Sequence, residues 1–293
     1  MYAQFFGNYL LSRKAVSTEQ LVRAIEEQHT KHVKIGTLAV HAGLMDTSQI
    51  DQILIRQTHE NRRFGELAID EGFLTQEQVD ELLQQQVPIY LLLGQCLVEN
   101  GALTETELDD LLASYQHDNE LLQLDTDIMQ QKNLQTLIHD LFLISFSNIP
   151  EFLSQYLTLL FNNLIRFVGE DFTPLNPTTC QEYVTNHGSA QIINGEFSLT
   201  SYLDMDEEAA IMFASRYAKE DFEEFDEYVQ ASIEDFLNLH NGLFNVNISN
   251  EKSIELLLNP PISIENTYVS SSSEIILLPI IYPFGTVNFF FKL

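Results

Sequence analysis

An acid and an amide stand three residues apart in the second half of the chain, at Asp235 and Asn238. The segment from about Phe222 to Asn245 has apolar residues at helical spacing, and residues at i and i+3 are neighbours on a helix surface. A carboxylate pairs with cations and an amide both donates and accepts hydrogen bonds, so this pair could contact and orient a polar partner. At about 100° per residue, the same face is predicted to carry Asn241, Gly242 and Asn245. A solvated helix face often has this composition, and that alternative stays open.

The elements around this helix predict an α+β domain over residues 150–293. A helix is expected over residues 151–169, and residues 170–189 indicate loop or weak strand. Asn194 and Gly195 separate two β-prone runs, which is a strong hairpin signal. A capped helix is expected over residues 207–218. Three strands are then expected, at 267–271, 274–282 and 286–293. Helices grouped against an antiparallel sheet are typical of the α+β class.

This arrangement resembles the CheC, CheX and FliY chemotaxis phosphatases, over roughly residues 150–293. Those proteins share a Glu-x-x-Asn pair on such a helix, with a proline 23 residues after the asparagine. Here Asp235-Phe236-Leu237-Asn238 matches with Asp in place of Glu, Gly242 stands where those proteins often have glycine, and Pro261 follows Asn238 by 23 residues. The motif occurs once, as in CheX.

The resemblance implies a partner and a reaction. In that family the helix is inserted into a phosphorylated CheY-type response regulator. The asparagine positions water for in-line attack on the aspartyl phosphate, and the acid engages the regulator's active-site lysine. On this basis Asp235 and Asn238 are the candidate catalytic residues of a response-regulator phosphatase in chemotaxis-type two-component signalling. CheX pairs as a dimer, so the resemblance also implies a homodimer through this domain.

The first 118 residues contain four copies of a 29-residue unit. A leading glycine recurs at Gly7, Gly36, Gly65 and Gly94. Ten residues later a capping residue appears, and a Gln or Glu follows three positions on, which is the spacing of a capping box. These pairs are Ser17 with Gln20, Asp46 with Gln49, Thr75 with Gln78, and Thr104 with Glu107. Helices are therefore expected to start near residues 18, 47, 76 and 105, each after a first helix that ends near Gly43, Gly72 or Gly101 in copies two to four.

These predictions together describe a multidomain chain. All-α helical-hairpin repeats are expected over residues 1–118, a connecting helix over 119–149, and the CheX-like α+β domain, with an antiparallel sheet and long helices, over 150–293.

The repeats resemble the N-terminal domains of GspE-like secretion ATPases and the related MshEN domain. Their hallmark is an Arg-Leu-Gly-like start, an apolar ladder and a closing Gln. Some members bind cyclic di-GMP through the leading Arg, the Gly backbone and the closing Gln, and others only dock partners. Copies two and three match best, so the resemblance implies a nucleotide site at Lys34, Gly36, Gln57, Arg63, Gly65 and Gln86.

The composition excludes several other classes of function. A formal net charge of −29 disfavours DNA, RNA and anionic membranes, because binding to each depends on Lys and Arg. Cys96 and Cys180 fall in different predicted domains, which argues against a disulfide framework and fits a reducing cytosol. The longest uncharged apolar stretch is too short to cross a bilayer. A cytoplasmic protein is therefore expected, without membrane insertion, a metal site or a required cofactor.

Three interpretations of the whole chain stay open. The first is a bacterial regulatory protein whose CheX-like domain binds and dephosphorylates a response regulator, with the repeats as input or docking module. The second is an interaction scaffold without catalysis. The third is a cyclic di-GMP sensor that uses repeats two and three.

Overall fold

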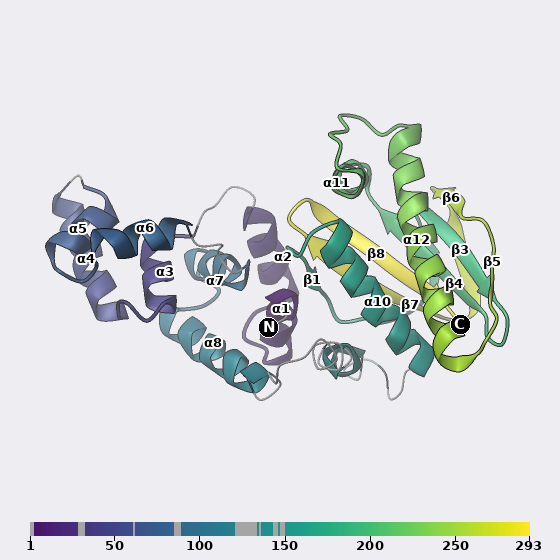
Figure 1. Ribbon diagram of the computed structural model, residues 1–293, viewed down its shortest axis with the longest axis horizontal. Coiled ribbons are helices and arrows are strands. Elements are labelled where there is room, and N and C mark those ends of the chain that lie inside the picture. The colour runs from purple at the N-terminus through teal and green to yellow at the C-terminus, as the bar shows by residue number, and fades with distance from the viewer. Residues whose placement is uncertain are drawn as a thin grey trace.

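The computed structural model describes residues 3–28, 33–60, 62–84, 89–120, 134, 136–142, 146 and 150–293. Helices make up the N-terminal part of the chain, and a sheet covered by helices makes up the C-terminal part (Figure 1). Within the described ranges, no helix is both long and apolar enough to cross a membrane.

The N-terminal helices follow one another in pairs. After a 3-10 turn, η1 (Ala3–Phe5), they are α1 (Phe6–Ser12) and α2 (Thr18–Glu27), α3 (Ile35–His41) and α4 (Thr47–His59), α5 (Phe64–Asp70) and α6 (Gln76–Gln84), and α7 (Ile89–Glu99) and α8 (Glu105–Glu120). The four predicted helix starts are confirmed at residues 18, 47, 76 and 105. In α2 and α4 the capping box is complete. The side chains of Ser17 and Asp46 accept from the backbone N–H of the third helical residue, and the side chain of that residue accepts from the backbone N–H of the cap. The turns within the later pairs contain Gly43, Gly72 and Gly101, all with positive φ.

The leading glycine of each unit lets its two helices approach closely. It faces the first apolar residue of the second helix, fourteen positions further on. A Cβ at Gly94 would lie 2.8 Å from Leu108 Cδ1, and a Cβ at Gly65 would lie 3.1 Å from Val79 Cγ1. Such distances leave no room for a methyl group without displacement of the neighbour. The two sequence signals, the glycine and the apolar residue after the cap, are therefore two sides of one contact.

We expect Gly94→Ala to destabilise the protein by about 1 kcal/mol, because overpacking against Leu108 outweighs the better helix propensity of alanine. Gly242→Ala is the matched control, since a Cβ there meets nothing within 4 Å. In the middle of a helix it should stabilise by about 0.5–1 kcal/mol. Urea unfolding followed by circular dichroism measures both. Stabilisation by both substitutions would contradict the contact.

The C-terminal sheet is antiparallel throughout its described strands. The strands are β1 (Thr173–Pro174), β2 (Thr178–Val184), β3 (His187–Asn194), β4 (Leu199–Met205), β5 (Leu257–Leu258), β6 (Ile262–Glu265), β7 (Tyr268–Tyr282) and β8 (Gly285–Lys292). Their order is β1-β7-β8-β4-β3-β5, with β2 also paired to β7 and β6 to β3. Three helices, α10 (Glu151–Phe167), α11 (Glu207–Ala218) and α12 (Glu227–Lys252), share the main apolar core with the sheet (Figure 1).

Most of the predicted elements of this domain are present, and two need correction. The hairpin at Asn194 and Gly195, the helix over 151–169 and the capped helix over 207–218 are confirmed as the β3–β4 turn, α10 and α11. The two strands expected at 267–271 and 274–282 are one strand, β7. It runs on without a break because β2 pairs with its first part and β8 with its second.

The long helix was also predicted with the wrong ends. Its N-cap is Asp226, whose side chain accepts from the backbone N–H groups of Tyr228 and Val229, and it extends beyond Asn245 to Lys252. Phe222 therefore precedes the helix rather than starting it.

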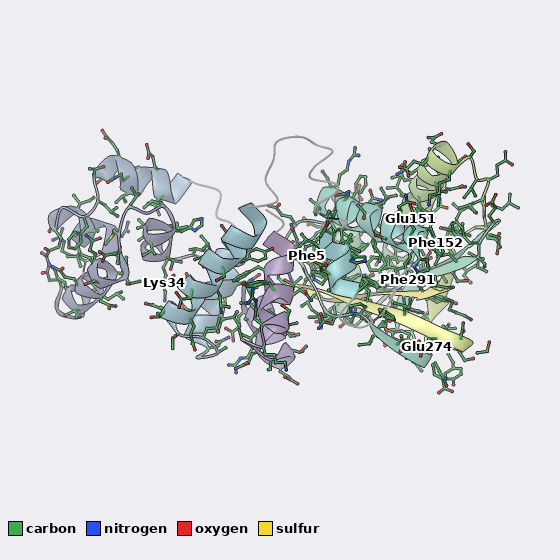
Figure 2. The ribbon with its side chains drawn as sticks, turned by 90° about the horizontal axis from the view of Figure 1, so that it is seen from below. Phe5, Lys34, Glu151, Phe152, Glu274 and Phe291 are labelled. Carbon is green, nitrogen blue, oxygen red and sulfur yellow. The ribbon has the colours of Figure 1, made fainter. Side chains whose placement is uncertain are left out.

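The first helices pack directly on the sheet domain. Phe5 belongs to the main C-terminal core and lies where the first helices meet the sheet domain (Figure 2). Its ring meets that of Phe161 edge to face, with centroids 5.4 Å apart. Asn8 Nδ2 donates to Asn176 Oδ1 at 2.7 Å. Ile281 of β7 is buried in the core of the helical part. The helical part and the sheet domain are thus joined by packing as well as by the chain.

The predicted connecting helix at 119–149 lies mostly outside the described residues. Residues 119 and 120 end α8, and residues 134 and 136–142 are helical. Four of these residues are buried in the main core, namely Leu134, Ile138, Leu141 and Phe142. The predicted domain boundaries stay a prediction.

Candidate functional site

Helix α12 presents the acid and the amide on its solvent side. It buries an apolar stripe that includes Ile233, Phe236 and Phe244 against the sheet and the neighbouring helices. Asp235 and Asn238 are both exposed. Their spacing therefore places them next to each other on a rigid and accessible surface, as the sequence predicts.

A tyrosine from the adjacent helix holds the Asp235 carboxylate. The hydroxyl of Tyr217, near the end of α11, donates to Asp235 Oδ2 at 2.6 Å. The Tyr217 ring packs edge to face between Phe167 and Phe236, at centroid distances of 6.1 and 5.6 Å. Burial, and then the hydrogen bond to Asp235, raise the pKa of Tyr217 well above its usual value. The hydroxyl therefore stays protonated and fixes one oxygen of the carboxylate.

A buried glutamine holds the Asn238 amide from beneath. Gln191 of β3, which is almost fully buried, donates from Nε2 to Asn238 Oδ1 at 2.8 Å and to the backbone oxygen of Asn259 at 2.8 Å. Asn259 stands two residues before Pro261, the motif proline. Gln191 thus connects the helix part of the motif to the segment that carries the proline.

Behind Gln191 the hydrogen bonds continue into the core. Asn241 Nδ2 donates to Gln191 Oε1 at 2.8 Å and to Ser201 Oγ at 2.9 Å. Asn241 Oδ1 accepts from the hydroxyl of Tyr156, on α10, at 2.7 Å. We call Tyr156, Ser201, Asn241 and Gln191 the amide network. All four are buried.

Asn241 does not lie on the face that the helical periodicity predicts. Asn241 was expected on the exposed face with Asp235 and Asn238, but it has no exposed surface. Periodicity alone cannot separate a polar residue on the surface from one that is hydrogen-bonded in the core. Gln191 and Tyr156 were not predicted at all. The signal that could have drawn attention to this region is the recurrence of asparagine, a poor helix former, within one helix.

His240, next to Asn241, is a packed core residue. Its ring lies edge to face on Tyr156 with centroids 4.3 Å apart, and Nδ1 lies 3.1 Å from Asn163 Nδ2. Complete burial lowers the pKa of His240 to about 3. The ring is therefore neutral in the folded protein at any pH near neutrality.

We expect the neutral state of His240 to make the protein sensitive to acid. Between pH 6.5 and 3 the unfolded state binds a proton at this residue and the folded state does not, so stability falls as the pH falls. From pH 7 to pH 5 the native protein should lose about 2 kcal/mol more than His240→Leu. Urea unfolding at a series of pH values gives the free energy of unfolding of each protein as a function of pH. The test is the difference between the two slopes, which does not depend on how stable the variant is at pH 7. Equal slopes would contradict a neutral, buried His240.

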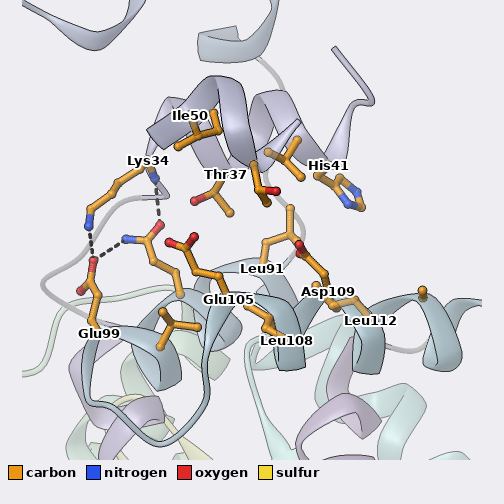
Figure 3. A pocket seen from close by; sticks show the side chains of 16 residues that line it. Lys34, Thr37, His41, Ile50, Leu91, Glu99, Glu105, Leu108, Asp109 and Leu112 are labelled. Atoms are coloured by element: carbon orange, nitrogen blue, oxygen red, sulfur yellow. Dashed lines mark hydrogen bonds and ion pairs between the residues drawn. The ribbon is translucent and has the colours of Figure 1, made fainter. Parts of the chain in front are cut away.

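The N-terminal part contains a cavity of about 270 Å³, but its lining differs from the predicted nucleotide site. Residues of α3, α4, α7 and α8 surround it, so it lies between copies two and four rather than two and three (Figure 3). Lys34 and Gly36 are part of its wall. Lys34 Nζ pairs with Glu99 at 2.6 Å, and Glu105 and Asp109 also line the cavity. Burial and Asp110 raise the pKa of Asp109.

The other predicted nucleotide-binding residues lie away from this cavity. Gln57 Nε2 donates to the backbone oxygen of Arg62, Arg63 is exposed, and Gly65 packs against Val79. Gln86 lies outside the described residues. The cavity wall thus contains two of the six residues, Lys34 and Gly36. The starts of copies two and three nevertheless lie against each other, since a Cβ at Gly36 would lie 3.3 Å from Phe64 Cζ. The carboxylates around the cavity are unfavourable for a nucleotide with two phosphates, and cyclic di-GMP binding stays a prediction.

Comparisons with known proteins give similarities to solved structures alone. No protein-family model matches the sequence, and no curated protein does. A CheC-like superfamily protein from Shewanella sp. PV-4 is 18% identical, with a TM-score of 0.43, over 49% of this chain and 97% of its own. The chemotaxis protein CheX from Desulfovibrio desulfuricans is 16% identical, with a TM-score of 0.42, over 49% and 99%. A chain of the CheX–CheY–BeF3–Mg²⁺ complex from Borrelia burgdorferi is 18% identical, with a TM-score of 0.43, over 48% and 97%.

Proposed function

We propose that the C-terminal domain binds a phosphorylated CheY-type response regulator through α12 and hydrolyses its aspartyl phosphate. Asn238 would orient the attacking water, and Asp235 would contact the regulator's active-site lysine. The observation that carries the proposal is that both side chains are exposed side by side and yet each is held by a hydrogen bond from the domain itself. A surface pair without a role needs no such support.

The reaction asks little of the protein beyond positioning. The water oxygen forms a bond to phosphorus while the bond from phosphorus to the aspartyl oxygen breaks. The electron pair leaves on the regulator's carboxylate, and the protons of the water end on phosphate and solvent. Phosphoryl transfer of this kind is catalysed largely by orientation and electrostatics, which a fixed amide and a fixed carboxylate can supply.

The charge around the site suits a partner with a basic group. The segment that leads into α12 is strongly acidic, with carboxylates at Glu220, Asp221, Glu223, Glu224, Asp226 and Glu227. A field of one sign attracts an oppositely charged partner and raises its rate of association. The lysine of a response regulator would approach along this field toward Asp235.

Gly242 leaves space on the helix surface beside Asn238, because it has no side chain. It is one helical turn after Asn238, and a Cβ there would meet nothing within 4 Å. Glycine inside a helix is unfavourable by roughly 0.5–1 kcal/mol relative to alanine. Because no internal contact requires the glycine, clearance for a bound partner is a reason for it. The N-terminal repeats, which pack on this domain, would serve as its docking or input module.

We expect Asn238→Ala to abolish acceleration of phosphate release from a chemically phosphorylated CheY-type regulator of the same organism. Loss of the group that orients the water should lower the rate roughly 100-fold. Asn250→Ala is the matched control, because Asn250 is an exposed asparagine further along the same helix. If Asn238→Ala is as active as the native protein, the proposed role is wrong. If the native protein accelerates no regulator, the domain is an interaction scaffold.

Asp235→Asn should weaken regulator binding about tenfold at low salt, because the charge partner of the regulator's lysine is removed while the shape is kept. Glu196→Gln, an exposed acid on the β3–β4 turn, is the control for net charge. Calorimetric titration with the phosphorylated regulator measures both. Equal affinities of the two variants would remove Asp235 from the interface.

A further inference from the structure

The Asn238 amide can face Gln191 in only one orientation. An asparagine side chain has an oxygen end that accepts and a nitrogen end that donates. Which end points inward decides which end a bound partner meets. The hydrogen-bonding partners of Gln191 determine this orientation.

The fixed point is the backbone oxygen of Asn259. It is an acceptor only, and it lies 2.8 Å from the Nε2 position of Gln191. The atom of Gln191 at that position must therefore be the nitrogen. The same nitrogen faces Asn238 at 2.8 Å, so Asn238 must present its oxygen inward and its NH2 group outward.

The rest of the amide network agrees with this polarity. With its nitrogen toward Asn259, Gln191 turns its oxygen toward Asn241, which donates to it at 2.8 Å. Asn241 then has its own oxygen free to accept from the Tyr156 hydroxyl at 2.7 Å. Reversal of Gln191 would oppose two oxygens at the partly buried contact with Asn259 and two nitrogens at the buried contact with Asn241. An unpaired buried polar group is unfavourable by about 1–3 kcal/mol, so the observed arrangement is favoured over the reversed one.

We propose that Gln191 is a positioning residue that sets the polarity of Asn238, so that the outward NH2 group donates to a phosphoryl oxygen of the bound regulator. The second lone pair of Asn238 Oδ1 then accepts from the attacking water. This inference rests on the proposed function for the identity of the acceptor. The polarity itself rests on the hydrogen bonds alone.

Two measurements on the full chain test the proposal separately. The first is hydrogen exchange of the side-chain NH2 groups by NMR. In the native protein, the NH2 groups of Gln191 and Asn241 should exchange at least about 100-fold more slowly than that of Asn238, because they are buried and bonded. Protection of the Asn238 NH2 group as strong as theirs would overturn the polarity. This result does not depend on whether the protein is a phosphatase.

The second measurement is the phosphatase reaction of Gln191→Met, which keeps the length of the side chain and removes its donor. We expect kcat to fall about tenfold while KM stays within about twofold, because the partner still docks but Asn238 is free to reverse. Gln230→Met is the control, since Gln230 also donates to a backbone oxygen, that of Gly188, and its other hydrogen bond goes to Glu234 rather than to Asn238. Tyr156→Phe, which removes only the last hydroxyl of the network, should also reduce kcat, but less than Gln191→Met does.

An unchanged kcat in Gln191→Met, with Asn238→Ala inactive, would overturn the positioning role. Inactivity of the native protein would count against the proposed function and leave the exchange measurement to decide the polarity.

Discussion

One chain of buried hydrogen bonds fixes how the long helix sits on the sheet. It runs from the Tyr156 hydroxyl on α10 through Asn241 on α12 to Gln191 on β3, and it ends at Asn238. Buried amides must find partners, because each unpaired group is unfavourable by about 1–3 kcal/mol. A rotation or shift of α12 would separate these partners all at once, whereas the apolar contacts around them could adjust. The same bonds that set the register of the helix therefore set the geometry of its exposed face.

The site is thus supported from two sides. Tyr217, wedged between aromatic rings, holds Asp235, and Gln191 holds Asn238. Neither supporting residue can be identified from the sequence next to the pair. Tyr217 and Gln191 lie in other elements, α11 and β3, which the fold brings against α12. A rigid acid and a rigid amide on an accessible helix are well suited to positioning chemistry, in which small displacements reduce the rate strongly.

The sequence predicts what depends on local chemistry and misses what depends on tertiary contacts. Capping residues such as Ser17 and Asp46 identify helix starts because the cap is satisfied within one turn. The hairpin at Asn194 and Gly195 and the spacing of Asp235 and Asn238 are local in the same way. The burial of Asn241 and the continuity of β7 are not, because each depends on partners that the fold brings together. The position of the cavity between copies two and four is also a tertiary result, which a repeat pattern alone does not contain.

The most direct test of the central claim is an NMR titration of the full chain with a CheY-type regulator, with and without beryllofluoride as a mimic of the phosphoryl group. If α12 is the docking surface, the activated regulator should shift the amide signals around Asp235 and Asn238 and in the acidic segment before the helix, and the unactivated regulator should shift them far less. Shifts confined to the N-terminal repeats, or none on α12 with any regulator of the organism, would contradict it.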